Sequence, residues 1–99
     1  MNSEDLGAFA PHPLEPGEAL RQLKRALRDL QLGERGNGFE LRGQTVLDHS
    51  VEASCLLVRL ARRPARAPEW DRHTLRSAAD LRKLLDEIKK RLTRWDRDE

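Results

Sequence analysis

The feature that most constrains the fold is a long amphipathic segment at the C-terminal end of the sequence. From Ser77 onward, apolar residues return at steps of three and four: Ala78, Leu81, Leu85, Ile88, Leu92 and Trp95, with Leu84 widening the stripe. This spacing is the period of an α-helix with one apolar face. Ser77 followed by Asp80 is typical of a capping box, and Arg94 and Arg97 suit the negative end of a helix. The segment predicts a helix from residue 77 whose apolar face is covered within the chain or by another copy.

A second apolar stripe lies nearer the N-terminus. It consists of Leu20, Leu23, Leu27 and Leu30 and follows Glu15 and Pro16, which favour the first turn of a helix. We predict a helix from about residue 15, ended by the glycine-rich stretch 33–38, which we interpret as a turn. Residues 1–14 hold two prolines and show no apolar period, so we expect a flexible tail over 1–14 and one domain over 15–97.

The middle of the chain favours strands. Residues 38–43 alternate apolar and polar, residues 53–62 hold a short apolar run before Pro64, and residues 69–76 alternate loosely. Five of the seven β-branched residues lie between positions 45 and 74, which supports this interpretation. We predict strands over 38–43 and 53–62 and a third over 69–76, and leave 45–52 unassigned.

Together these elements predict an α+β fold, a small two-layer sandwich in the order α-β-β-(β)-α with two helices on one face of an antiparallel sheet. The alternative is an all-α three-helix bundle in which residues 48–63 form a helix. The expected core draws on both stripes and on the apolar runs between them: Leu20, Leu23, Leu27, Leu30, Leu41, Leu56, Val58, Leu81, Leu85, Ile88 and Leu92.

Several function classes have no support in the sequence. The chain has 99 residues and lacks a run of about 18 apolar residues, so we expect no membrane span, and its first residues do not resemble a signal peptide. Cys55 stands alone, which fits a cytoplasmic protein. The run Asp48-His49-Ser50 invites a catalytic interpretation, but neighbours on one strand point in different directions. The three histidines are scattered, so we expect no enzyme, no metal and no cofactor.

Charge gives one functional lead. The formal net charge is +2, yet residues 1–18 carry four acids and no Lys or Arg. The densest basic stretch runs from residue 59 to 76 and holds six arginines: Arg59, Arg62, Arg63, Arg66, Arg72 and Arg76. Such a cluster attracts phosphates and gives salt-dependent binding. It makes a nucleic-acid-binding module the alternative function.

The element order resembles that of the double-stranded-RNA-binding domain, which also runs helix, strands, helix. That resemblance implies a basic cluster at the start of the last helix. Here the corresponding stretch, residues 77–83, opens with Ser77 and Asp80, so the part that would hold RNA is missing.

The first functional hypothesis is therefore a non-enzymatic binding or regulatory module that acts through protein–protein contacts, including self-association. It rests on the small size and on the strength of the C-terminal stripe. We expect the interface on the apolar face of that helix, at four residues: Leu84, Ile88, Leu92 and Trp95.

Overall fold

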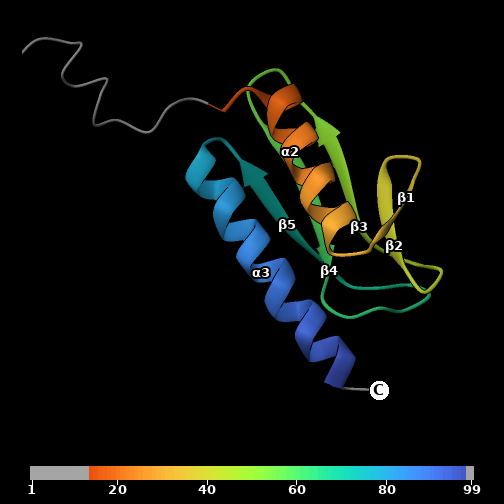
Figure 1. Cartoon of the computed structure of the whole chain (residues 1–99). Coiled ribbons are helices and arrows are strands. Elements are labelled where there is room, and N and C mark those ends of the chain that lie inside the picture. Colours follow the sequence, from red (N-terminus) through yellow and green to blue (C-terminus); the bar gives the residue numbers. More distant parts are fainter. Residues whose placement is uncertain (1–13, 98–99) are drawn as a thin grey trace, which may run out of the picture.

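The computed structural model describes residues 14–97 and shows two helices covering one face of a five-stranded antiparallel sheet (Figure 1). The elements follow one another as α2 (Pro16–Asp29), β1 (Gly33–Arg35), β2 (Gly38–Leu41), β3 (Gln44–Val51), β4 (Leu56–Ala61), β5 (Trp70–Leu75) and α3 (Ala78–Arg97). The predicted α+β class and the placement of both helices on one face are confirmed. The all-α alternative is wrong, because residues 48–63 lie in β3, β4 and the turn between them.

The sheet is a simple meander in which each strand pairs with the next, in the order β1-β2-β3-β4-β5. The predicted strands near 38–43, 53–62 and 69–76 correspond to β2, β4 and β5, and the unassigned stretch 45–52 is β3. The interpretation of 33–38 as a turn needs correction, since Gly33–Arg35 pairs with β2 and only residues 36 and 37 turn. Gly36 takes a positive φ of 57° there, so the glycine signal belongs to a hairpin within a sheet.

Local side-chain contacts explain where both helices begin. The carboxylate of Glu15 accepts hydrogen bonds from the N–H groups of Gly17 and Glu18, with Pro16 in the first turn. At α3 the N–H of Asp80 donates to the Ser77 hydroxyl at 3.2 Å. The Asp80 carboxylate in turn accepts from the N–H of Arg76 at 2.9 Å. The predicted cap at Ser77 and Asp80 is confirmed.

The core fills the space between the helices and one face of the sheet. Its buried members come from every element except β1: Ala19, Leu23, Leu27, Leu32, Phe39, Val46, Leu47, Leu56, Val58, Leu60, Ala61, Leu75, Leu81, Leu84, Ile88 and Trp95. A register shift between β2 and β3 beside Phe39 allows two consecutive residues of β3, Val46 and Leu47, to be buried together. Five of the residues expected in the core are only partly buried at its edge: Leu20, Leu30, Leu41, Leu85 and Leu92.

The predicted tail over residues 1–14 lies outside the described residues except for its last member. Leu14 is not part of a free tail. Its N–H donates to the carbonyl of Arg76 at 3.0 Å, and its side chain packs against the core. Within residues 14–97 no helix combines the length and the apolar character needed to cross a bilayer.

Candidate functional site at the edge of strand β5

Strand β5 forms one edge of the sheet, and its outer side faces no other strand among the described residues. The N–H of Arg62 donates to the carbonyl of Glu69 at 2.9 Å, which marks one bonded pair of the β4–β5 ladder. Bonded pairs alternate along an antiparallel ladder. The register Val58↔His73 therefore turns the odd-numbered residues of β5 toward β4. The backbone N–H and C=O groups of Trp70, Arg72 and Thr74 point to the open edge.

Arg76, the next even-numbered residue, confirms this alternation at the C-terminal end of β5. Its carbonyl accepts a hydrogen bond from the N–H of Leu14 and none from β4. Its N–H goes to the Asp80 carboxylate. By contrast, the outward backbone groups of Arg72 and Thr74 make no hydrogen bond within residues 14–97. Unpaired N–H and C=O groups in a row are a template for another strand.

A groove runs between this edge and α3. Its walls come from β5 and from the first four turns of the helix, and they comprise Arg72, His73, Thr74, Leu75, Asp80, Lys83, Leu84, Glu87 and Arg91. Asp80 is committed to the helix cap, and Glu87 to Arg91 at 2.7 Å. Among residues 14–97, Arg72 and Lys83 form no ion pair within 4 Å. The groove therefore offers a free strand edge with Lys83 beside it, and the Arg72 side chain lies at the same edge on the sheet face away from the helices.

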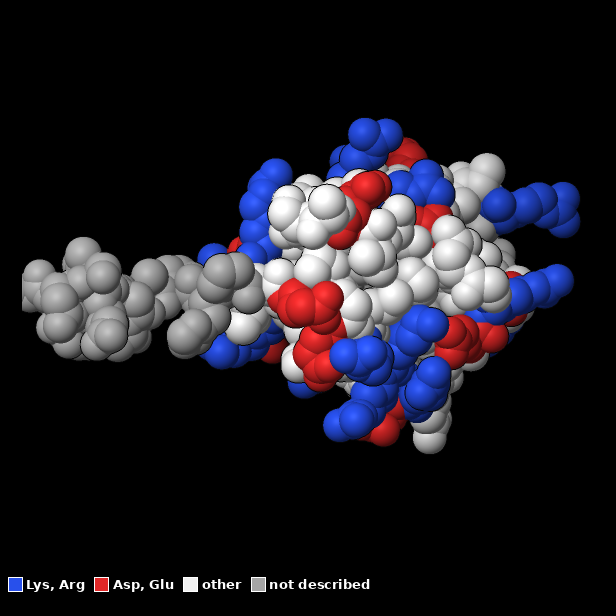
Figure 2. Space-filling model, turned by 90° about the horizontal axis from the view of Figure 1, so that it is seen from above, with Lys and Arg blue, Asp and Glu red and all other residues white. Residues whose placement is uncertain are grey.

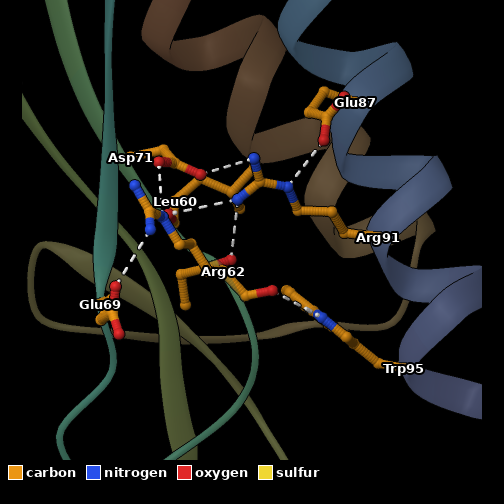
Figure 3. Close-up of polar contacts among 8 residues, drawn as sticks. Leu60, Arg62, Glu69, Asp71, Glu87, Arg91 and Trp95 are labelled. Carbon is orange, nitrogen blue, oxygen red and sulfur yellow. Dashed lines mark hydrogen bonds and ion pairs between the residues drawn. The ribbon is translucent and has the colours of Figure 1, made fainter. Parts of the chain in front are cut away.

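A network of polar contacts holds the far end of α3 against the sheet (Figure 3). The Arg91 guanidinium donates to Asp71 at 2.7 Å and to the carbonyl of Ala61 at 3.0 Å. Trp95 donates its ring N–H to the carbonyl of Arg62 at 3.2 Å. The Arg91 side chain is only 11% exposed, so these contacts are shielded from water. They fix the distance between β5 and α3, and with it the width of the groove.

The same network sets the ionisation of its acids. Hydrogen bonds from Arg62, and then from Arg91, hold the pKa of the Asp71 carboxyl below its ordinary value. Arg91 likewise lowers the pKa of Glu87. Both carboxylates therefore stay charged and paired well into the acidic range.

The structure divides the six arginines of the basic stretch. Arg59 pairs with Asp48 and lies over the Trp70 ring, 4.7 Å from its centroid. Arg62 binds Asp71 and Glu69, both at 3.0 Å. Arg63 and Arg66 lie in the loop between β4 and β5. Together with Arg72 and Arg76, they form no ion pair within residues 14–97, so carboxylates do not neutralise these four charges. Arg76 lies at the opposite end of β5 from this loop.

Charges of both signs are interleaved elsewhere on the surface. Seen from above, Lys and Arg side chains surround a central uncharged band, and Asp and Glu side chains lie between them (Figure 2). This face carries no broad area of one sign.

The predicted interface on α3 also needs correction. Leu84, Ile88 and Trp95 are buried against the sheet and α2, and Leu92 is partly buried beside them. The apolar stripe is thus covered within the chain, one of the two outcomes that the sequence left open. These side chains are core residues, and a partner surface has to be sought elsewhere.

The residues weighed for catalysis and metal binding do not converge. Asp48 and Ser50 face the side of the sheet away from the helices, whereas His49, between them, is buried on the helix side. Within residues 14–97 no three His, Cys, Asp or Glu side chains lie close enough together to hold a metal ion. Burial, and then the charge of Lys24, lowers the pKa of His49. Its Nε2 atom, like that of His73, has no hydrogen-bond partner in the described part of the chain.

The sequence singled out Arg72 and Leu84 among the residues that line this groove, but not the open strand edge, although one signal for the edge was present. The alternation of residues 69–76 separates the two faces of β5 correctly. Which backbone N–H and C=O groups of β5 remain without a partner depends on its pairing with β4, and the sequence does not show which strands pair. No family model matches the chain, and neither a curated protein nor a solved structure matches it.

Proposed function

We propose that this protein is a non-enzymatic binding module that takes up an extended segment of a partner protein along the open edge of β5. The observation that carries the proposal is the pair of outward, unbonded backbone groups at Arg72 and Thr74. Strand addition supplies affinity through main-chain hydrogen bonds and specificity through alternate side chains. Protein recognition of this kind needs no catalytic group and no cofactor.

The form of β5 supports the proposal. It holds six residues, contains no proline, and pairs with β4 over its whole length without a shift in register. An added strand would lie in the groove beside α3, with Arg72 and Lys83 close to its side chains. We therefore expect the partner segment to carry an acidic residue among apolar or β-branched ones. We also propose a cytoplasmic location, which the free thiol of Cys55 fits.

A library of random peptides displayed on phage tests this function. The selection uses the full chain as bait, with Thr74→Pro as the counter-bait. Proline at residue 74 removes one outward N–H and leaves the bonds to β4 in place, so the variant should fold but lose peptides that pair with the edge.

Enriched peptides should shift the amide signals of residues 72–76 and of the facing turns of α3. Lys83→Glu should weaken peptides that contain an acid by roughly tenfold, because it reverses one of the two cations. Peptides that bind Thr74→Pro equally well, or that shift signals on α2, would overturn the proposal.

One observation favours nucleic acid as a second candidate. On the sheet face away from the helices, Trp70 lies beside Arg59, and Arg72 is directly opposite Arg59 in the register. Aromatic and arginine side chains on an open sheet face are the usual platform for single strands. Phe39 and Trp95 are both buried, whereas Trp70 is only partly buried, so among the Phe and Trp side chains of residues 14–97 it is the one that a base could reach.

A titration with single-stranded DNA and duplex RNA at low and physiological salt separates this candidate from the first. It predicts that Arg63→Ala with Arg66→Ala and Arg72→Ala lowers the salt dependence of binding. Lys90→Ala with Arg94→Ala and Arg97→Ala on α3 removes the same number of positive charges and is the matched control. Equal losses in both variants would mean that only net charge matters.

A further inference from the structure

A second hollow, separate from the groove, lies between the β4–β5 loop and the C-terminal half of α3. Its lining comprises Arg62, Arg63, Ala65, Ala67, Pro68, Glu69, Asp71, Arg91 and Arg94. Four of these residues are arginines and two are acids, so four positive charges face two negative ones. The hollow is therefore basic, and Asp71 places it at the N-terminal end of β5.

Both acids of this hollow already have partners. One carboxylate oxygen of Asp71 accepts from Arg62 at 3.0 Å and the other from Arg91 at 2.7 Å (Figure 3). Glu69 accepts from Arg62 at 3.0 Å. Arg62 and Arg91 therefore offset both acids of the hollow, and neither acid is left to neutralise a further cation.

The surplus charge lies on the two remaining arginines, which come from two different walls. Arg63 belongs to the loop and Arg94 to α3; both are exposed, and neither forms an ion pair within residues 14–97. Arg63 directly follows Arg62, whose carbonyl accepts the ring N–H of Trp95 at 3.2 Å. Arg94 directly precedes Trp95 in the sequence. This one hydrogen bond thus brings two unpaired cations to the same hollow.

The loop wall also offers backbone donors. A hydrogen bond of 2.9 Å joins the two ends of the loop, and two prolines restrict the backbone near its ends: Pro64 and Pro68. The N–H groups of Ala65 and Ala67 donate to no group within residues 14–97, and short side chains leave them accessible. Donors that are held in place before binding cost little to organise.

This combination suits a phosphate group. A guanidinium binds two phosphate oxygens through a planar pair of N–H groups, so two arginines from different walls can hold one tetrahedral group between them. A phosphate monoester carries about 1.5 to 2 negative charges near neutral pH. That charge matches the two cations that the acids of the hollow leave unpaired. The alanine and proline side chains of the lining suit the carbon side of an ester.

We propose that this hollow binds a phosphate monoester group, with Arg63 and Arg94 as its two charged contacts. The site goes beyond the proposed function and does not rest on it, because it includes none of the outward backbone groups of β5. It is also distinct from the nucleic-acid platform, which lies on the sheet face away from the helices and does not include Arg94. A nucleic acid without terminal phosphates holds only diesters, so the two sites are separable.

Titration of the full chain with inorganic phosphate, followed by NMR through the arginine Nε–H signals, tests the site. Arg63→Gln and Arg94→Gln should each weaken binding roughly tenfold, because each removes a charged pair of hydrogen bonds. Arg66→Gln and Arg97→Gln are the matched controls, since each is an exposed, unpaired arginine of the same wall that does not line the hollow, judged on residues 14–97. At about 0.15 M salt, where distant charges are screened, the controls should weaken binding by less than about twofold.

A phosphoserine peptide of otherwise small residues, titrated beside inorganic phosphate, distinguishes two sources of the group. Tighter binding of the peptide would assign the site to a phosphorylated protein, and equal binding would assign it to free phosphate. Three results overturn the inference: no saturable shift of the Arg63 and Arg94 signals, equal losses in the control variants, or equal binding of the peptide without its phosphate. Because no strand is added to β5 in this titration, the peptide selection above is judged separately.

Discussion

The two edges of the sheet differ in ways that decide which of them can accept another strand. β1 has three residues, all exposed, and begins at Gly33. β5 has six residues in unbroken register with its neighbour. Short edge strands are one of the ways in which proteins prevent unwanted pairing. β1 is protected by its short length, whereas the length of β5 gives it no such protection.

Each edge strand has a carboxylate that forms ion pairs with a helix, and we call these pairs the tie of that edge. The two ties differ in how far they are shielded from water. On β1, Glu34 binds Lys24 at 2.8 Å and Arg28 at 2.9 Å, both from α2. On β5, Asp71 binds Arg91 from α3, and that arginine is almost buried. Arg91 also donates to the backbone carbonyl of Ala61 at the end of β4, so this tie joins α3 to two strands, whereas the β1 tie joins α2 to one.

The largest expected effect concerns the alternation along β5. His73→Pro removes an N–H that bonds to β4 and should lower the free energy of unfolding by about 3 kcal/mol or more. Thr74→Pro removes an outward N–H and should lower it by less than about 1 kcal/mol. Urea denaturation of both variants measures the difference. Equal losses would mean that the assignment of inner and outer backbone groups is wrong.

The second effect concerns the shielded tie. Arg91→Met keeps much of the side-chain volume but leaves Glu87 and the Ala61 carbonyl without this donor and leaves Asp71 with Arg62 alone. We expect a loss of about 2 kcal/mol in unfolding free energy, since partly buried acceptors lose a charged partner. Lys90→Met, at the exposed neighbouring position of α3, should change it by less than about 0.5 kcal/mol. A near-neutral Arg91→Met would show that the network does not hold α3 in place.

A third prediction concerns the β1 side of the sheet. A Cβ atom at Gly38 would lie 2.7 Å from the carbonyl oxygen of Leu47, so the β2–β3 backbone would have to move. Gly38→Ala should cost about 1 to 2 kcal/mol. Gly33→Ala meets nothing within 4 Å and should be neutral or stabilising by about 0.5 kcal/mol, because the unfolded chain loses freedom. Thermal unfolding of the two variants should move in opposite directions; a stable Gly38→Ala would contradict the close approach.

The fold was largely predictable because its signals are local. The cap at Ser77 and Asp80, the helix starting at Pro16 and the alternation of β5 all depend on residues within a few positions of one another. β1 was missed because the glycines of its hairpin have the same composition as a plain turn. The burial of Val46 together with Leu47 depends on a register shift that only the partner strand defines.

The candidate site was less predictable because it depends on pairs that are distant in the sequence. Arg62 and Asp71 are neighbours only after β4 and β5 have paired, so counting arginines overstated the charge that is free to bind a ligand. The stripe on α3 has the same pattern whether it packs in a core or on a partner. Leu84 and Trp95 became core residues because the sheet covers them. An open strand edge is a property of backbone groups and has no residue signature.

The smallest effect compares the two carboxylate ties through pH. Lys24, and then Arg28, lower the pKa of Glu34 to about 2. Arg62 and then Arg91 lower that of Asp71. A carboxyl whose pKa is lowered by folding contributes stability above its ordinary pKa and loses it as the pH falls through the folded-state value. Urea midpoints should therefore fall between about pH 4.5 and 2, and Glu34→Gln and Asp71→Asn should each flatten part of that fall.

Salt then distinguishes the edges. Added salt screens pairs that are open to water more than pairs that are shielded. The share of the pH dependence removed by Glu34→Gln should shrink at high salt, because Arg28 is 60% exposed. Of the two pairs at Asp71, salt should screen the one with Arg62, which is 60% exposed, more than the one with Arg91, which is 11% exposed. The share removed by Asp71→Asn should therefore shrink only in part. High salt could instead shrink the contributions of Glu34 and Asp71 to the pH dependence equally. The contacts of Arg91 would then be as open to solvent as those of Glu34, and α3 would be held against β5 no more firmly than α2 is held against β1.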